Sequence, residues 1–404
     1  MIPMRSQGRY DMESIKEYDK EYIANTYRRF PVVLTHGKGS VVYDENEKEY
    51  IDMSSGIAVN TFGYADAEWQ AAVTSQLSSL QHASNLYYTS PCARLAKLIC
   101  EKTGMKKVFF SNSGAEANEC AIKVARKYAE MKKGKEYYNI ITLKNSFHGR
   151  TLTTLAATGQ DVFHNDFTPL TEGFCYAAAG DLSEVERLIG EYPTAAVMIE
   201  VVQGEGGVNA LDHDFVTGLY DMLKKRDILL ICDEVQIGNG RSGKLYGYMN
   251  YGITPDIFTT AKGLGGGLPI GATVIGEKAK DVLSPGMHGS TFGGNPVCCA
   301  GAISIIERID DEVLSGVCER VKYINDQLNG ADGVESVSGM GLMIGIKTKR
   351  PASDVIAECI ERGVLVISAK DKVRLLPALN IPMPQLKKAV DIIKDVCKSC
   401  KEDI

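Results

Sequence analysis

The chain has 404 residues, 44% of them hydrophobic and 24% charged, and a formal net charge of −6. This composition predicts a globular protein with a large core, and the acidic balance argues against a general nucleic-acid or anionic-membrane binder. The N-terminal segment contains no apolar stretch typical of a signal peptide, and no apolar run approaches the ~20 residues of a membrane span. We therefore expect a cytoplasmic protein.

The eleven cysteines are scattered, and only Cys298–Cys299 and Cys397–Cys400 lie close in sequence. An odd count without regular spacing argues against a disulfide framework. Cys397 and Cys400 close an amphipathic pattern that begins at Leu386, which favours a core or surface role over a redox pair or half of a zinc site. Because there is no second such motif and no cluster of histidines, we expect no metal centre.

Short β-branched or aromatic runs alternate with helical patterns between about residues 105 and 276. One of these patterns places Ala121, Val124, Ala125 and Tyr128 on one face of a helix. Strands are predicted at 108–110, 139–143, 195–202, 228–232, 256–261 and 272–276. This alternation predicts an α/β fold with a mainly parallel, doubly wound sheet.

The pattern changes after residue 296 to a long helix, three groups of short strands and a closing helix. The strand groups lie at 336–347, 364–368 and 373–377. We therefore predict a small C-terminal domain at 296–404, with the N-terminal segment 1–55 packing beside it. The large domain would then span 56–295.

Open parallel sheets bind ligands beyond the carboxyl ends of their strands. Here the glycine-rich loops that follow residues 110, 143, 202, 232 and 261 would meet at that edge. In the first of them, Ser113, Gly114 and Ala115 lead from a strand into a helix, whose free N–H groups suit a phosphate. An ordinary capped helix has the same pattern. A Walker A sequence is absent, which argues against a nucleoside triphosphate.

Two charged residues follow buried strands in the next loops. Asp233 would either hold a positive charge on a ligand or have a local structural role, capping a helix or pairing with Arg241. Lys262 would either extend to the surface or, desolvated by the apolar and glycine-rich segment around it, act as a neutral Schiff-base amine. A phosphate cradle, a carboxylate for a pyridinium nitrogen and an amine nucleophile together predict pyridoxal 5′-phosphate.

The sequence resembles the class III (fold type I) aminotransferases from about Asn25 to the C-terminus. Seven ordered motifs carry the resemblance: SNSGAEANECAIKVAR, SFHGRT, VVQGEGG, DEVQIGNGRSGK, KGLGGGLPIGA, HGSTFGGNP and RLLPAL. It implies a mainly parallel central sheet with helices on both faces, a smaller α/β domain made from the N- and C-terminal segments, and pyridoxal 5′-phosphate as the cofactor.

The resemblance also implies how the cofactor is held. Lys262 would bond to the cofactor aldehyde and carry a proton, and Asp233 would pair with the pyridine nitrogen. Phe147 would stack on the ring, and Gln236 would bond its hydroxyl group. The remaining cofactor contacts implied in this way are Ser113, Gly114, Ala115, Glu234, Val235 and Thr291.

The substrate contacts implied by the resemblance begin with Arg374, which would grip the α-carboxylate of glutamate. Glu205 would pair with Arg374 when the substrate presents only a terminal amine, and Arg150 would bind the distal carboxylate. Tyr27 and Ser290 would also contact the substrate. Ser290 and Thr291 would reach the site of a second subunit, so the resemblance implies a homodimer.

Three departures from the family pattern stand out, and none of them removes a catalytic group. Residues 63–67 read GYADA where the family has GHxHP, a segment at the family's active site and dimer interface. Val201 and Ala378 replace prolines that are common at these positions.

The activity implied is a ping-pong transfer of a terminal amine to 2-oxoglutarate. The SFHGRT motif favours N2-acetylornithine as the donor, with ornithine, succinylornithine, 4-aminobutyrate and lysine as alternatives. A second reading is a pyridoxal-phosphate aminomutase or racemase, which has no need for a switchable Glu205–Arg374 pair. A third is a non-catalytic protein of the same fold, although the lysine, aspartate and phosphate motifs are all present.

Overall fold

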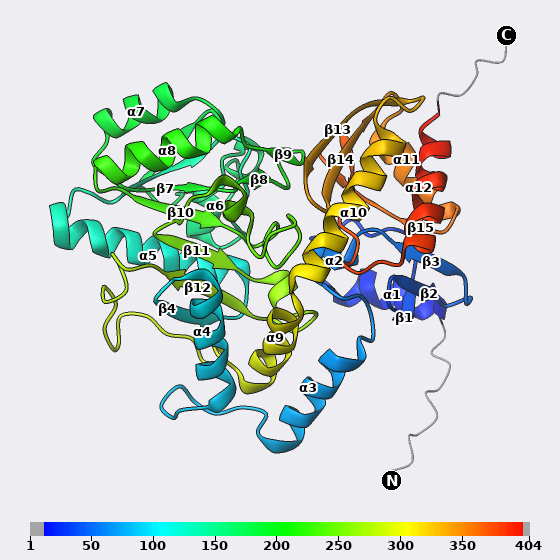
Figure 1. Cartoon of the computed structure of the whole chain (residues 1–404), viewed down its shortest axis with the longest axis horizontal. Helices are drawn as coiled ribbons and strands as arrows, with labels where there is room; N and C mark the ends of the chain where they lie inside the picture. The colour runs from blue at the N-terminus through cyan, green and yellow to red at the C-terminus, as the bar shows by residue number, and fades with distance from the viewer. Residues whose placement is uncertain (1–11, 399–404) are drawn as a thin grey trace.

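The structure is a computed structural model that describes residues 12–398. Its larger part surrounds one seven-stranded sheet, seen on the left of Figure 1. In spatial order the strands are β4 (Lys107–Ser111), β12 (Gly271–Ile275), β11 (Ile257–Thr260), β10 (Leu229–Asp233), β7 (Thr194–Ile199), β5 (Asn139–Leu143) and β6 (Phe174–Ala177). Only β12 runs antiparallel to its neighbours, so the predicted mainly parallel sheet is confirmed.

Two features of this sheet differ from the prediction. The apolar run 195–202 is broken after Ile199, and its end forms β8 (Val202–Gln203), which pairs with β9 (Asn209–Ala210) in a separate ribbon. Strand β6 was not predicted, because its four residues FCYA at the sheet edge give too short an apolar run.

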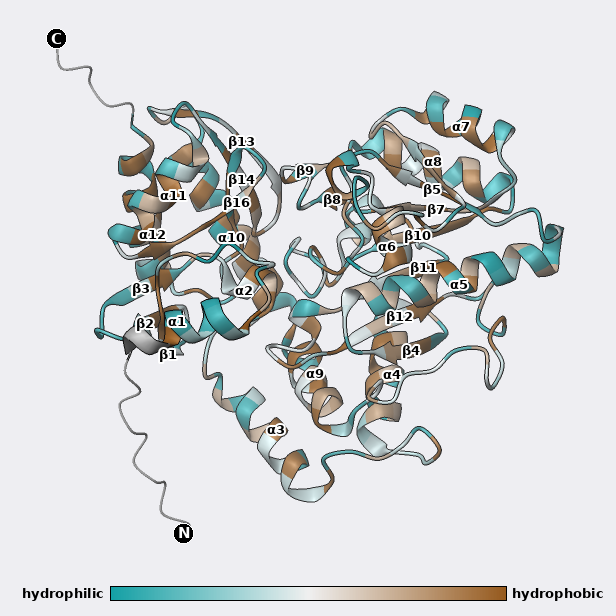
Figure 2. Ribbon diagram, turned by 180° about the vertical axis from the view of Figure 1, so that it is seen from behind, coloured by the Kyte–Doolittle hydropathy of each residue, from teal (hydrophilic) through white to brown (hydrophobic). Residues whose placement is uncertain are grey.

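Helices cover both faces of the sheet. Helix α5 (Gly114–Lys133) buries the predicted face of Ala121, Val124, Ala125 and Tyr128. On β10, Leu229 and Ile231 pack with α5, whereas Leu230 and Cys232 share a core with α8 (His213–Lys225) and α7 (Leu182–Glu191). Figure 2 shows hydrophobic strands between helices that carry hydrophilic stretches. The alternation of β10 between two cores is what a doubly wound sheet requires.

The smaller part joins the two ends of the chain. Strands β1 (Leu34–Lys38), β2 (Val41–Asp44) and β3 (Glu49–Asp52) form a sheet that β15 (Val364–Leu365) completes beside β3. A second sheet has the order β13 (Val334–Met340), β14 (Met343–Thr348), β17 (Lys372–Leu375), β16 (Ile367–Ala369). Their helices are α10 (Asp311–Leu328), α11 (Ala352–Glu361) and α12 (Met383–Cys397). Val42, Tyr50 and Met53 share one core with these C-terminal elements, so the two ends pack together (Figure 1).

The single long helix predicted after residue 296 is instead two helices. Helix α9 (Pro296–Arg308) ends before Asp310, whose side chain accepts a hydrogen bond from the Val313 amide and starts α10. Helix α9 packs on α3 (Ala67–Ser79) and α4 (Ser90–Thr103) and belongs to the core of the large sheet. The domain boundary at 296 stays a prediction.

Cys397 is buried at the end of α12, which agrees with a core role, and Cys400 lies outside the described residues. Among residues 12–398 the structure contains no helix that is both long and apolar enough to cross a membrane.

The segment 63–67, which departs from the family pattern, has a local structural explanation. The Tyr64 hydroxyl donates to Asp52 Oδ2 at 2.8 Å. The Asp66 side chain caps α3 at the Trp69 amide and pairs with Arg308 at 2.8 Å. These contacts tie the start of α3 to β3 and to α9.

Candidate active site

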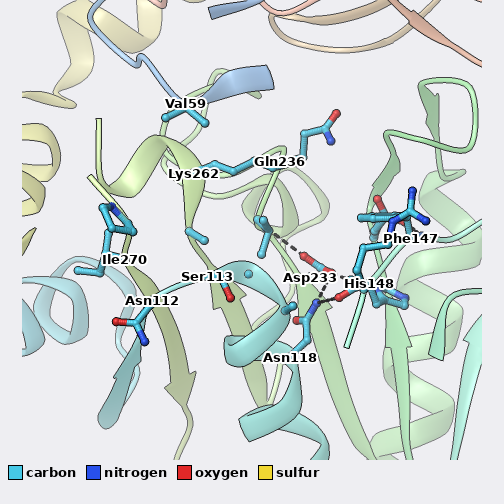
Figure 3. Close-up of a pocket in the computed structure, with 18 of the residues that line it drawn as sticks. Val59, Asn112, Ser113, Asn118, Phe147, His148, Asp233, Gln236, Lys262 and Ile270 are labelled. Atoms are coloured by element: carbon cyan, nitrogen blue, oxygen red, sulfur yellow. Dashed lines mark hydrogen bonds and ion pairs between the residues drawn. The ribbon is translucent and has the colours of Figure 1, made fainter. Parts of the chain in front are cut away.

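A cavity of about 640 Å³ lies at the carboxyl ends of the parallel strands. Ten residues predicted from the sequence as site residues line it: Tyr27, Ser113, Gly114, Ala115, Phe147, Arg150, Asp233, Val235, Gln236 and Lys262. Nine of them lie at or after the ends of β4, β5, β10 and β11, which are far apart in the sequence, and Tyr27 comes from the segment between α1 (Met12–Tyr22) and β1. Figure 3 shows Lys262, Asp233 and Phe147 around this cavity.

Lys262 follows β11 in a one-turn 3₁₀ segment (Lys262–Leu264). Its φ is +46°, a left-handed conformation that non-glycine residues rarely adopt. Burial lowers the pKa of the Lys262 amine, and the negative charge of Glu205 opposes this shift only in part. Within residues 12–398 the amine makes no hydrogen bond or ion pair. A lysine in this setting loses its proton more readily than a solvated one, which suits a nucleophilic amine.

Asp233 ends β10 and accepts three hydrogen bonds. Asn118 Nδ2 and His148 Nδ1 each lie 2.8 Å from Oδ2, and the Val235 amide lies 3.1 Å from Oδ1. Arg241, the alternative local partner, instead donates to the carbonyls of Leu342 and Pro377. The carboxylate is thus held in one orientation at the edge of the cavity.

Asn118 and His148 are functional residues that the sequence reasoning missed. Asn118 also donates to the His148 carbonyl at 2.7 Å and accepts from the Thr259 hydroxyl at 2.6 Å. His148 is buried, and in the described part of the chain its Nε2 has no hydrogen-bond partner. A signal was available for both: His148 stands inside the SFHGRT motif, and Asn118 is an amide on the buried side of an otherwise apolar helix face.

The start of α5 offers unused donors to the cavity. The Ser113 hydroxyl accepts from the Glu116 amide at 3.2 Å, and the first helical hydrogen bond joins the Ala117 amide to the Ser113 carbonyl. The amides of Gly114 and Ala115 therefore have no partner within the helix. A Cβ on Gly114 would lie 2.7 Å from Val235 Cγ1, so only glycine fits here. Together with Lys262 and Asp233, this donor set fits pyridoxal 5′-phosphate.

Arg374 and Glu205 form a two-pronged ion pair beside the cavity. Arg374 Nη1 and Nη2 lie 2.5 and 3.3 Å from Glu205 Oε1 and Oε2. Gln236, on the cavity wall, accepts from Arg374 at 3.0 Å and donates to Glu205 at 3.3 Å. Burial alone would raise the pKa of Glu205, but the Arg374 guanidinium outweighs it and holds the pKa below its usual value. The pair is therefore charged at neutral pH.

Arg150 and Tyr27 lie at the mouth of the cavity, where both are exposed. The Arg150 guanidinium lies 5.5 Å from the Phe147 ring centroid and 4.3 Å from that of Phe163. Two aromatic rings thus hold this cation without neutralising it, which leaves its charge available to an anionic group.

Five predicted site residues are not part of the cavity lining: Glu205 and Arg374, which lie beside it, and Glu234, Ser290 and Thr291. The Glu234 side chain points elsewhere: it accepts from the amides of Gly247 and Tyr248 at 2.6 and 2.8 Å. Ser290 Oγ accepts from Asn112 Nδ2 at 3.1 Å, and Thr291 is exposed. The contribution of Ser290 and Thr291 to a second subunit stays a prediction.

Glu200 is a further buried carboxyl on the cavity wall that was not predicted. Its oxygens accept from the amides of Phe147 at 2.8 Å and Gly204 at 3.2 Å. Burial raises the pKa of Glu200 from 4.5 to about 7.

Glu200→Gln is therefore expected to change how stability depends on pH. Between pH 4.5 and about 7 the folded parent holds a proton on Glu200 that the unfolded chain has lost, so this group makes stability fall as pH rises. In this pH range the free energy of unfolding of the variant should therefore fall less steeply with pH than that of the parent, by up to ~1.4 kcal/mol per pH unit. Urea unfolding at several pH values measures it, and an unchanged slope would contradict the raised pKa.

Comparisons with known proteins identify the family of this chain. The family model for aminotransferase class-III matches residues 22–397. The acetylornithine aminotransferase of Haemophilus ducreyi is 47% identical over 386 residues, which cover 95% of this chain and 98% of that protein. The crystal structure of the ornithine aminotransferase from Toxoplasma gondii ME49 superposes with a TM-score of 0.92 at 29% identity, covering 96% of this chain and 95% of that one. The chain belongs to the class III aminotransferase family.

Proposed function

We propose that the chain transfers the terminal amine of N2-acetyl-L-ornithine to 2-oxoglutarate, giving N-acetyl-L-glutamate 5-semialdehyde and L-glutamate in arginine synthesis. The observation that carries the proposal is the Glu205–Arg374 pair beside Lys262, because an enzyme that alternates between an ω-amine and glutamate needs such a pair. Six relatives named acetylornithine aminotransferase, 41–47% identical over nearly the whole chain, support this donor.

Class III aminotransferases use pyridoxal 5′-phosphate, which supplies an electron sink for the carbanion formed at the amine-bearing carbon. Lys262 would hold the cofactor and move the proton to and from that carbon. Asp233, fixed by Asn118 and His148, would keep the pyridine nitrogen protonated. The Gly114 and Ala115 amides would bind the phosphate. Phe147 and Val235 would enclose the ring from the cavity wall.

The two half-reactions place opposite demands on Arg374. An ω-amine donor presents no carboxylate near the reacting carbon, so Glu205 would stay paired with Arg374 and neutralise it. Glutamate and 2-oxoglutarate carry a carboxylate there, which would replace Glu205 at the guanidinium. Arg150 would bind the distal carboxylate in both cases, and Tyr27 would contact the substrate at the mouth.

The two other readings fit less well. An aminomutase or racemase has no use for an exchangeable partner of Arg374. A non-catalytic protein would be expected to lack the lysine, the aspartate or the helix start, and all three meet in one cavity.

A single half-reaction tests the proposed donor. The purified protein, loaded with pyridoxal phosphate, receives N2-acetylornithine, ornithine, succinylornithine or 4-aminobutyrate without any 2-oxo acid, while the visible absorbance of the bound cofactor is followed. We expect N2-acetylornithine to bleach it fastest. Ornithine is the main competitor, since the ornithine aminotransferase from Toxoplasma gondii has a closely similar fold. Faster bleaching by ornithine would show that ornithine is the preferred amino donor, while the reaction would still be a transamination.

The proposal includes a homodimer. Leu86, Tyr87 and Tyr88 are 86%, 73% and 107% exposed, and an apolar cluster of this kind favours burial in an interface. Asn85 joins them to the loop of Ser290 by donating to its carbonyl at 3.0 Å. If a second copy of the chain bound to this surface, Ser290 and Thr291 of one subunit would lie near the cavity of the other subunit.

We place the protein in the cytoplasm. The ten cysteines among the described residues are all free thiols, which suits a reducing compartment.

A further inference from the structure

The backbone that carries Lys262 is strained. A left-handed φ of +46° at a non-glycine residue costs about 1–2 kcal/mol, so its surroundings must impose it. The turn itself supplies only two hydrogen bonds, from the Leu264 amide to the Ala261 carbonyl and from the Gly265 amide to the Lys262 carbonyl, both at 2.9 Å. Glycines at 263 and 265 add no side chain, so Leu264, buried in the core, is the only apolar side chain between them that anchors the turn.

Three side chains from outside the turn hold alternate carbonyls on both sides of Lys262. Asn239 Nδ2 donates to the Ala261 carbonyl at 3.3 Å. The Thr61 hydroxyl donates to the Gly263 carbonyl at 2.8 Å, and the Trp69 indole donates to the Gly265 carbonyl at 3.0 Å. Asn239 follows β10, whereas Thr61 and Trp69 belong to the segment 61–69, so the three bonds fix the turn against two parts of the fold.

Trp69, the only tryptophan of the chain, fits into a slot made by glycines. A Cβ on Gly266 would lie 3.0 Å from Trp69 Nε1, and one on Gly301 would lie 2.9 Å from it. Gly266 is directly after the carbonyl that the indole binds. The indole therefore lies directly against the lysine turn.

Thr61 also connects this turn to the segment that follows Arg374. The Thr61 carbonyl accepts from the Leu379 amide at 2.9 Å, while its hydroxyl binds Gly263. Thr61 is 2% exposed, so neither bond competes with water. Thr61 thus bonds to the residue after Lys262 and to a residue five positions after Arg374, and it is not part of the lining of the 640 Å³ cavity.

We propose that Thr61 and Trp69 are positioning residues for Lys262: their hydrogen bonds to the Gly263 and Gly265 carbonyls hold the lysine turn in the conformation that presents the amine to the cofactor aldehyde. Neither residue touches the substrate. The inference rests on the role of Lys262 proposed above. It places a structural requirement of the reaction in the segment 61–69, outside the motifs that carry the chemistry.

The test uses Thr61→Val, which keeps the side-chain shape and removes the hydroxyl. Apoprotein is mixed with pyridoxal phosphate, and the rate of covalent capture is followed by absorbance. We expect this rate and kcat both to fall about tenfold, because a displaced nucleophile loses its near-attack geometry. The KM for 2-oxoglutarate should stay within about twofold, because the backbone bond to Leu379 remains and Arg374 keeps its place.

Matched variants separate positioning from general damage. Thr194 is also 2% exposed, and its hydroxyl donates to the Tyr192 carbonyl at 2.7 Å at the opposite end of the sheet. Thr194→Val should capture the cofactor at the parental rate, Thr61→Ser should restore it, and Trp69→Phe should slow it. Capture by Thr61→Val at the parental rate would overturn the inference. Covalent capture by Lys262→Ala would instead overturn the proposed role of Lys262 itself.

Discussion

Replacing Lys262 with alanine is expected to abolish transamination, with kcat at least ~10³-fold lower, while the protein still binds pyridoxal phosphate without a covalent bond. The phosphate donors at Gly114 and Ala115 and the carboxylate of Asp233 remain, so binding should survive. The amine is the group that burial has prepared as a nucleophile, and no other lysine lines the cavity among the described residues. Reduction with borohydride followed by mass spectrometry measures the covalent bond directly.

Lys97→Ala, at an exposed position on α4, is the control and should behave as the parent. A second measurement distinguishes a catalytic lysine from a structural one. Burial lowers the pKa of Lys262, so at neutral pH, where the unfolded chain carries a solvated ammonium group, the folded apoprotein must either bury that charge or release its proton, and both cost stability. Lys262→Met keeps the aliphatic stem and should raise the melting temperature of the apoprotein at neutral pH by about 2 °C or more. A lower melting temperature of Lys262→Met, or full turnover by Lys262→Ala, would contradict the assignment of Lys262 as the catalytic lysine.

The sequence was informative where chemistry and periodicity coincide. Loops after buried strands must meet at one edge of a parallel sheet, so Asp233 and Lys262 could be brought together from spacing alone. The apolar face of α5 followed from its 3.6-residue period. The antiparallel direction of β12 could not be predicted, because the hydrophobic pattern of a strand does not depend on whether it runs parallel or antiparallel to its neighbours. The connection from Thr260 to Gly271, without a crossover helix, is what reverses it.

Residues that act through other residues were harder to find. Asn118 shows in the sequence only as an amide on an apolar helix face, and Glu200 carries no pattern of its own. Only the fold shows that Asn118 orients Asp233 and that Glu200 accepts a hydrogen bond from the Phe147 amide. Glu234 stands beside Asp233 in the motif, but successive residues at the end of a strand point to opposite sides, so its side chain faces away from the cavity and its contact with the cofactor stays a prediction. Thr61 and Trp69 are separated from Lys262 by about half of the chain, so no local pattern could connect them.

The second large effect is expected from Glu205→Ala. The Arg374 side chain is 3% exposed, and after this change Gln236 is its only remaining hydrogen-bond partner among residues 12–398. An uncompensated cation beside the reacting carbon should attract substrates that carry a carboxylate there. We expect the half-reaction with N2-acetylornithine to slow about tenfold or more, and attack at the α-amine of glutamate or ornithine to gain by a similar factor. Separate single-turnover measurements with each amine determine both rates.

The sign of the pH dependence gives an independent check of this switch. Because Arg374 holds the pKa of Glu205 below its usual value, the pair contributes stability at neutral pH and loses it only as acid protonates the carboxylate. The opening of the pair during turnover must therefore come from the carboxylate of the incoming substrate, not from titration near pH 7. Glu205→Gln keeps the shape and one acceptor oxygen but not the charge, so it should resemble Glu205→Ala in substrate preference. If Glu205→Gln instead matches the parent in both half-reactions, a hydrogen bond suffices and the electrostatic exchange is not the mechanism.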